Sequence, residues 1–276
     1  MHGIILIRQG PRRARPCFLT MIDLHCHILP ALDDGPKVIE ESVEMARVAV
    51  AKGIRALAAS PHVLETQSVT LNRERIEQAL IQLRERLAAE GIALELLLGA
   101  EYYLSQDFPH LLEKHFPLAS LGGSRYVLIE IPMTHVPPYL EYSTLHSGIQ
   151  NPELQKELPF LRPIIAHPER YLEVLRNLKI AEGFRALGYL LQVNLGSLAG
   201  RYGRSVRKTA EKMIKAGWVD FVATDAHSAS ALAEVLDHGI KRLRKVAGEE
   251  GTRILIEENP ARVLQGLPLR SLKEDA

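Results

Sequence analysis

Short apolar stretches alternate with amphipathic helical stretches along most of this 276-residue sequence, which limits the folds open to it. Seven stretches are predicted to be strands: 21–26, 56–60, 94–100, 126–131, 163–166, 189–194 and 219–224. Between them, apolar residues keep helical spacing and glycines mark the helix ends, as at Gly53, Gly91 and Gly217. Repeated strand–helix units favour a parallel sheet, so the predicted fold class is α/β.

Histidines and acidic residues recur at or just after the carboxyl ends of six of these seven strands. The candidates are His25, His27, Asp34, His62, Glu101, Glu130, His167, Asp225 and His227. In a closed barrel the carboxyl ends of all strands meet at one mouth, where barrel enzymes place their chemistry. An open sheet would spread these residues along a line. We therefore expect a seven-stranded (β/α)7 barrel with a single site.

The spacing of the candidate residues supports a shared site. Side chains alternate faces along a strand, so His25 and His27 point to the same side, and Cys26 to the other. The pair Asp225 and His227 repeats this spacing late in the chain.

Several acidic candidates also have structural interpretations. Asp33 and Asp34 precede Gly35-Pro36, where one of them would cap the next helix; we assign Asp33 to structure and Asp34 to metal. Glu101 is alternatively an ordinary acid at a helix start. Glu130, inside an apolar strand, needs a partner because an unpaired buried charge is costly.

Five imidazoles and four carboxylates, with no thiolate required, suit Mn²⁺, Fe²⁺ or Zn²⁺ better than Ca²⁺ or a cysteine-rich zinc site. Nine ligands are too many for one ion and suit two or three. Such a centre would carry excess positive charge, attract a phosphate dianion and generate hydroxide near neutral pH. This chemistry points to phosphate-ester hydrolysis.

Basic and aromatic residues near the predicted mouth are candidates for substrate binding. Arg170 follows His167 closely, and the alternative role for it is a salt bridge with a neighbouring acid. Arg201 and Arg204 precede a helix, where they either hold an anion or form a solvated basic face. The long segment 132–150 contributes His135 and Tyr139.

Composition favours one globular domain over residues 21–268, with 46% apolar residues and no long polar tract. We expect residues 1–20 to be a disordered or mis-started tail and residues 269–276 to be a second tail. Without the four arginines of residues 1–20, the formal net charge of +1 becomes −3, so bulk charge gives no support for nucleic-acid binding. Two cysteines argue against a disulfide framework and for a cytoplasmic location, and no segment is predicted to span a membrane.

The candidate residues occur in contexts that resemble a known superfamily. These contexts are Asp23-Leu-His25-Cys-His27, Asp33-Asp34-Gly35-Pro36, Ser60-Pro61-His62, Gly99-Ala-Glu101-Tyr-Tyr, Leu128-Ile-Glu130, His167-Pro-Glu-Arg170 and Thr224-Asp225-Ala-His227. Their order and spacing resemble the polymerase-and-histidinol-phosphatase superfamily. More narrowly, they are similar to bacterial protein-tyrosine phosphatases of capsule and exopolysaccharide operons.

This resemblance implies a distorted seven-stranded barrel and a trinuclear, manganese-favouring site. It also implies a partner, since the family dephosphorylates phosphotyrosines on the tail of a bacterial tyrosine kinase. By the same analogy Arg170 binds phosphate, and we assign catalysis to Arg170, Asp225 and His227, with a metal-bridging hydroxide attacking phosphorus. One departure is that relatives often carry an arginine soon after the Asp-x-His motif, where this chain has Ser228 and small residues.

Two rival functions remain at this point. The first is histidinol-phosphate phosphatase or a small-nucleotide phosphoesterase on the same fold. The second is a catalytically silent metal-binding scaffold. The sequence leaves the physiological metal and a homo-oligomeric state open.

Overall fold

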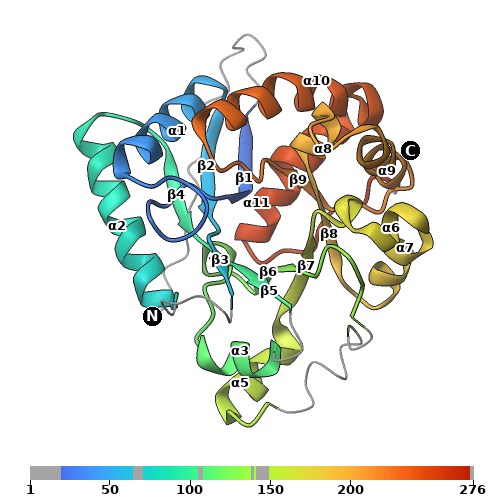
Figure 1. Ribbon diagram of the computed structural model, residues 1–276, viewed down its shortest axis with the longest axis horizontal. Coiled ribbons are helices and arrows are strands. Elements are labelled where there is room, and N and C mark those ends of the chain that lie inside the picture. Colours follow the sequence, from blue (N-terminus) through green and yellow to red (C-terminus); the bar gives the residue numbers. More distant parts are fainter. Residues whose placement is uncertain (1–19, 65–70, 105–107, 138–139, 141–148, 274–276) are drawn as a thin grey trace.

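The computed structural model describes residues 20–64, 71–104, 108–137, 140 and 149–273 (Figure 1). Its strands are all paired in parallel and form a three-stranded sheet, β1-β2-β4, and a six-stranded sheet, β3-β5-β6-β7-β8-β9. The strands are β1 Met21–Cys26, β2 Ile54–Ala59, β3 His62–Val63, β4 Glu95–Leu98, β5 Glu101–Tyr103, β6 Tyr126–Glu130, β7 Arg162–Ala166, β8 Leu190–Asn194 and β9 Phe221–Ala223. The predicted α/β class is confirmed.

The strand count differs from the seven predicted, because nine strands occur in the described residues. The extra two, β3 and β5, each start within three residues of the preceding strand and move into the other sheet. Pro61 has no N–H to continue the ladder after β2. After β4, Gly99 passes so close to β2 that a Cβ there would lie 3.0 Å from the Ala59 carbonyl oxygen. These local breaks divide the strands between two sheets, so a continuous seven-stranded barrel is not confirmed.

The end of β9 meets the end of β1 across the two sheets. Cys26 and Ala226 form an isolated parallel bridge. The His27 N–H donates to the Ala226 carbonyl at 3.0 Å, and the Asp225 N–H donates to the His25 carbonyl at 2.8 Å. These bonds bring the segment that contains His25 and His27 beside the segment that contains Asp225 and His227.

Helices surround the sheets. Helices α1 and α2 pack against each other and against β2 and β4, and α10 lies beside α1 (Figure 1). The helices are α1 Ile39–Ala51, α2 Arg73–Ala89, α3 Phe108–Lys114, α5 Pro152–Glu157, α6 Leu172–Arg176, α7 Lys179–Ala186, α8 Leu195–Ala199, α9 Arg204–Lys215, α10 Ala229–Arg253 and α11 Asn259–Leu264. Within the described residues, none of them is both long and apolar enough to cross a bilayer.

The glycines predicted to end helices adopt the left-handed backbone that such ends need. Gly53, Gly91 and Gly217 have φ values of 91°, 65° and 71°. The start of the first helix was predicted less well. It begins at Ile39, and its N-cap is Val38 rather than Asp33 or Asp34. The two aspartates before it are therefore available for other contacts.

The apolar core has two parts. The larger lies between the strands and the surrounding helices. The smaller is built from strand residues together with Leu121, before β6, and Val263 of α11. Its strand members are Ile22, Leu24, Ala56, Ala58, Leu97, Tyr126, Leu128, Ile164, Ala166, Phe221 and Ala223. This packing fixes the strands whose carboxyl ends carry the candidate ligands.

Candidate metal centre

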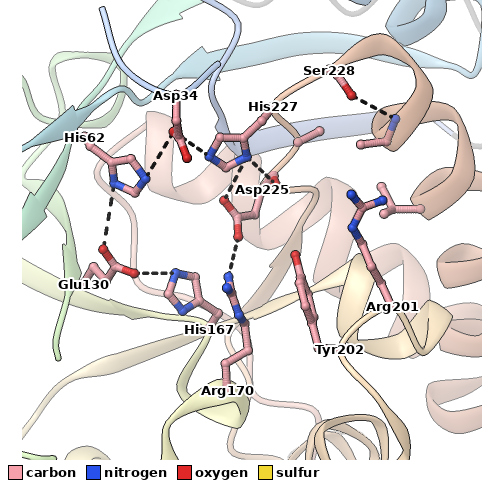
Figure 2. Close-up of a pocket in the computed structure, with 13 residues that line it drawn as sticks. Asp34, His62, Glu130, His167, Arg170, Arg201, Tyr202, Asp225, His227 and Ser228 are labelled. Carbon is pink, nitrogen blue, oxygen red and sulfur yellow. Dashed lines mark hydrogen bonds and ion pairs between the residues drawn. The ribbon is translucent and has the colours of Figure 1, made fainter. Parts of the chain in front are cut away.

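The structure brings all nine candidate ligands together at the carboxyl ends of the strands. His25 is in β1, His62 begins β3 and Glu101 begins β5. The other six lie at the end of a strand or in the segment after one: His27 and Asp34 after β1, Glu130 at the end of β6, His167 after β7, and Asp225 and His227 after β9. Figure 2 shows six of them around one pocket.

Glu101 lies at the buried centre of this group. Within the described residues, neither of its carboxylate oxygens has a hydrogen-bond partner by geometry. Imidazole nitrogens nevertheless lie close: His62 Nδ1 at 2.9 Å, His25 Nε2 and His167 Nε2 at 3.3 Å, and His27 Nε2 at 3.6 Å. Several electron-pair donors thus face one another, which is the arrangement that a cation between them would satisfy.

Asp225 has one oxygen directed at the imidazoles and one held by neutral and cationic donors. Its Oδ1 lies 3.3 Å from His25 Nε2 and 3.4 Å from His27 Nε2. Its Oδ2 accepts from Arg170 Nη1 at 3.0 Å and from Asn194 Nδ2 at 2.5 Å. The second set of contacts fixes the carboxylate and leaves Oδ1 facing the cluster.

The outer part of the cluster opens toward solvent. Asp34 Oδ1 lies 3.2 Å from His227 Nε2 and 3.7 Å from His62 Nε2, and its side chain is 69% exposed. Glu130 approaches His167 Nε2 at 3.6 Å and His62 Nδ1 at 3.8 Å. These residues would be accessible to a substrate at the mouth (Figure 2).

Three overlapping sets in the described residues have ligand atoms within 4.8 Å of one another. They are His27, Asp34, His62 and His227; His25, His27 and Glu101; and His62, Glu101 and Glu130. Because the sets share members, the donors suit a cluster of ions with bridging ligands better than separate sites. Nitrogen and oxygen donors fit Mn²⁺, Fe²⁺ or Zn²⁺.

The electrostatics of the cluster also favour bound cations. Burial alone lowers the pKa of His25, but the carboxylates of Glu101 and Asp225 raise it to about 9. Burial raises the pKa of Glu101, but His25 and the neighbouring imidazoles hold it well below its usual value. Burial and the charge of Glu101 together raise the pKa of Glu130. The buried carboxylates therefore require positive charge nearby, which protons or metal ions would supply.

Asp33 is a structural residue, as the sequence suggested, but it supports a candidate ligand rather than a helix. Its Oδ2 lies 2.7 Å from His27 Nδ1, and its Oδ1 accepts from the Gly35 N–H at 2.9 Å. A Cβ on Gly35 would lie 2.5 Å from the His27 carbonyl oxygen, so this close turn requires glycine. Contact with a carboxylate at Nδ1 leaves Nε2 of His27 for a metal.

Two candidate ligands have an unusual backbone. His167 and Asp225 adopt positive φ values of 34° and 52°. Non-glycine residues rarely do so, and such strain concentrates at functional sites.

The pocket in front of the cluster has a volume of about 290 Å³. Arg170, Arg201 and Tyr202 line its wall together with the outer ligands (Figure 2). The Arg170 guanidinium carbon lies 4.3 Å from the centre of the Tyr202 ring, a cation–π arrangement. Arg201 forms an exposed ion pair with Glu234 at 2.9 Å. Two arginines therefore lie beside the site, one partly buried and one at the rim.

The other residues predicted to bind substrate are not found at the pocket within the described part of the chain. Arg204 and His135 are exposed and are not among the described residues that line the pocket. Tyr139 lies outside the described residues. Contacts between these three side chains and a substrate stay predictions.

Five further histidines lie in the tail or in predicted loops and helices, where the sequence predicts surface positions: His2, His110, His115, His146 and His238. His110 and His238 are exposed. The expectation for His115 was wrong, because this side chain is buried and lies edge-on to the Tyr102 ring, with the ring centres 6.5 Å apart. His2 and His146 lie outside the described residues.

Sequence reasoning missed Gln192, Asn194 and Tyr202. Gln192 and Asn194 are fully buried at the end of β8, and Asn194 donates to Asp225. The sequence did indicate them. Gln192 and Asn194 are two residues apart at the end of a predicted strand, like His25 and His27, so their side chains are expected on the same face. Tyr202 lies in the loop before α9 and had no comparable signal.

The fold and this cluster define a class: α/β proteins with parallel strands and a candidate polynuclear metal centre at their carboxyl ends. A family described as "Capsular polysaccharide synthesis, CpsB/CapC" matches residues 21–265. The chain belongs to this family.

Its relatives agree with this assignment. The tyrosine-protein phosphatase YwqE of Bacillus subtilis is 37% identical over 238 residues, covering 86% of this chain and 89% of YwqE. The tyrosine-protein phosphatase CpsB of Streptococcus pneumoniae is 28% identical, covering 88% of this chain and 98% of CpsB. A crystal structure from work on YwqE and CpsB, described as metal-dependent tyrosine phosphatases, matches with a TM-score of 0.80 and 33% identity, covering 91% of this chain and 97% of that one.

Proposed function

We propose that this protein is a metal-dependent protein-tyrosine phosphatase, a hydrolase of phosphate monoesters. The observation that carries the proposal is the convergence of nine imidazoles and carboxylates in one cluster, six of which line a pocket whose wall also holds Arg170. Relatives named tyrosine-protein phosphatases, which align over most of this chain, support the substrate class.

Two or three divalent ions, with Mn²⁺ favoured, would be held by the nine residues in a distorted seven-stranded barrel formed from the two sheets. Bound ions would supply a water-derived nucleophile at neutral pH and stabilise charge on phosphoryl oxygens. Glu101 and Asp225 would each hold metal together with imidazoles, because each approaches at least two of them. Asp34 and His227 would hold the ion nearest to solvent.

Arg170 would orient the phosphoryl group. Its guanidinium is held between Asp225 and the Tyr202 ring, so it is fixed before substrate arrives. A planar guanidinium with several N–H donors matches the oxygens of a phosphate. The tyrosine leaving group has a pKa of about 10 and needs less protonation than an aliphatic alkoxide. Asp225 would contribute twice, as a ligand and by orienting Arg170.

The physiological substrate would be a phosphotyrosine protein, and we propose the tail of a tyrosine kinase that controls capsule or exopolysaccharide synthesis. This assignment extends the family description to a partner. It implies that the folded unit, residues 21–268, acts in the cytoplasm on that tail. Arg201, at the rim, would contact the phosphate or the peptide around it.

The test compares substrates on one preparation. Chelated protein and protein restored with Mn²⁺ are assayed on a phosphotyrosine peptide, histidinol phosphate and a nucleotide 3′,5′-bisphosphate. We expect metal-dependent phosphate release from the peptide, and loss of that activity in Asp225→Asn. Asp237→Asn is the matched control, since Asp237 is an exposed aspartate on α10. Turnover of histidinol phosphate or the nucleotide alone would overturn the substrate class, and metal binding without any turnover would favour a scaffold.

A further inference from the structure

A buried chain of hydrogen bonds connects two candidate ligands, His25 and Asp225. His25 Nδ1 lies 2.9 Å from Gln192 Oε1, Gln192 Nε2 donates to Asn194 Oδ1 at 2.7 Å, and Asn194 Nδ2 donates to Asp225 Oδ2 at 2.5 Å. Gln192 and Asn194 have no exposed surface. Water therefore cannot replace any bond in this chain.

The chemistry of the last member fixes the direction of every bond. An ionised carboxylate only accepts, so Asn194 must present its amide nitrogen to Asp225. The Asn194 oxygen then faces Gln192, which must present its own nitrogen. The Gln192 oxygen is left facing His25, where it accepts and cannot donate. Nδ1 of His25 must therefore carry the proton.

We propose that Gln192 and Asn194 are positioning residues that fix His25 in the tautomer with a free Nε2. That nitrogen lies 3.3 Å from both Glu101 Oε2 and Asp225 Oδ1, at the centre of the cluster. The same chain holds Asp225 Oδ2, so Oδ1 stays directed at the imidazoles. Two amides thus set the donor atoms of two ligands. The inference rests on the metal site of the proposed function and concerns how that site is prepared.

Asp33 performs a related task for His27, with a carboxylate at 2.7 Å from Nδ1. The neighbouring ligands are therefore oriented by different groups: one by a charged acceptor, the other by neutral amides. A neutral acceptor is suited to His25, because a carboxylate at Gln192 would add negative charge next to Asp225. Outer groups of this kind typically change metal affinity about 10–100-fold when removed.

Two substitutions at one position separate this role from packing. Gln192→Met keeps the volume but has no strong acceptor for His25, whereas Gln192→Glu keeps that acceptor, loses the donor to Asn194 and adds a buried charge. A residue needed only for packing would tolerate Met better than Glu. A residue needed as an acceptor would tolerate Glu better than Met. Gln78→Met and Gln78→Glu, on the exposed face of α2, are the matched controls.

The measurement is Mn²⁺ affinity by competition with a chelator, together with the number of ions bound. We expect Gln192→Met to bind about 10–100-fold more weakly than the unsubstituted protein, and Gln192→Glu to stay within about tenfold of it. Unchanged affinity in Gln192→Met, or equal losses in both variants, would overturn the positioning role while leaving the metal site intact. Absence of metal binding by the unsubstituted protein would instead overturn the proposed function.

A second measurement needs no variant at position 192 and holds if the glutamate variant fails to fold. Nitrogen-15 NMR of the zinc-loaded protein reports which ring nitrogen of His25 carries hydrogen. A proton on Nδ1 is expected, with its signal assigned by its loss in His25→Gln. A proton on Nε2 would overturn the proposal.

Discussion

The ligand cluster and the amide chain beside it are both buried and polar, yet they are organised in opposite ways. In the cluster, imidazole nitrogens and carboxylate oxygens crowd together, and positive charge between them is needed to satisfy all of them; His25 Nε2, for example, lies 3.2 Å from His27 Nε2. In the amide chain, every donor faces an acceptor. Buried polar groups without partners are costly, so the cluster requires cations and the amide chain does not. The difference separates the groups that would bind metal from the groups that hold them in place.

The largest effect is expected from removing the central charge of the cluster. Glu101→Gln replaces a carboxylate that approaches four imidazoles. We expect kcat/KM to fall at least about 10³-fold, since a metal centre contributes several kcal/mol to catalysis. Steady-state kinetics on a phosphotyrosine peptide with excess Mn²⁺ measure it. Glu95→Gln, on the exposed start of β4, should leave activity unchanged; activity retained in Glu101→Gln would place the metal elsewhere.

Metal ions should stabilise the fold through the cluster. At a concentration about 100 times the dissociation constant, a ligand that binds only the folded state adds about 2.7 kcal/mol. For a chain of this size that corresponds to a rise in Tm of about 5–10 °C. Thermal unfolding with chelator and with Mn²⁺ tests this, and Glu101→Gln should lose most of the rise. An equal Tm under both conditions would mean that the cluster does not need cations.

Intermediate effects are expected at Arg170, which lies between the cluster and the pocket. Arg170→Lys keeps the charge but loses the planar fork and the contact with Tyr202. We expect a fall in kcat/KM of about 10–100-fold for Arg170→Lys, and a larger fall for Arg170→Met. Arg176→Lys, on α6, is the control. Metal affinity should change little, which distinguishes Arg170 from the ligands.

Tyr202→Leu should have a smaller effect, because it removes only the aromatic face over Arg170. A cation–π contact contributes about 0.5–2 kcal/mol, which corresponds to a loss of up to about 30-fold in kcat/KM. Tyr202→Phe keeps the ring and should restore most of the activity. If the leucine and phenylalanine variants behaved alike, the ring would have no part in orienting Arg170.

The smallest effect is expected at His115. This histidine is buried but is not a member of the metal cluster. Burial, with a contribution from Lys114, lowers its pKa below the ordinary histidine value of 6.5. The unfolded chain therefore binds a proton more readily, and stability should decrease as pH falls below about 6.5. His115→Gln should show a weaker decrease in Tm between pH 7 and 5.5, whereas His110→Gln should follow the unsubstituted protein. Parallel curves for all three would contradict this assignment.

Much of the site could be predicted because its residues follow strand ends. His25 and His27 share a face through strand periodicity alone, and Glu130 was identifiable as a charge within an apolar strand. The division into two sheets was not predictable, since it depends on how closely Gly99 passes β2. The burial of His115 depends on packing against Tyr102, which is equally invisible in a local pattern.

The roles of Gln192 and Asn194, which support the ligands, were even harder to predict from the sequence. Gln192 and Asn194 had a visible spacing, but neutral amides are not ligand types, and their role depends on contacts with residues far apart in the sequence. Ligand chemistry can be recognised from residue type, whereas hydrogen-bond direction requires coordinates.

The most direct test of the account is phosphate release from a phosphotyrosine peptide as Mn²⁺ is added stepwise to fully chelated protein. We expect no release without metal, and activity that rises until two or three equivalents are bound. Full activity in the chelated protein, or saturating metal without any release, would contradict the assignment of this cluster as the catalytic centre of a metal-dependent tyrosine phosphatase.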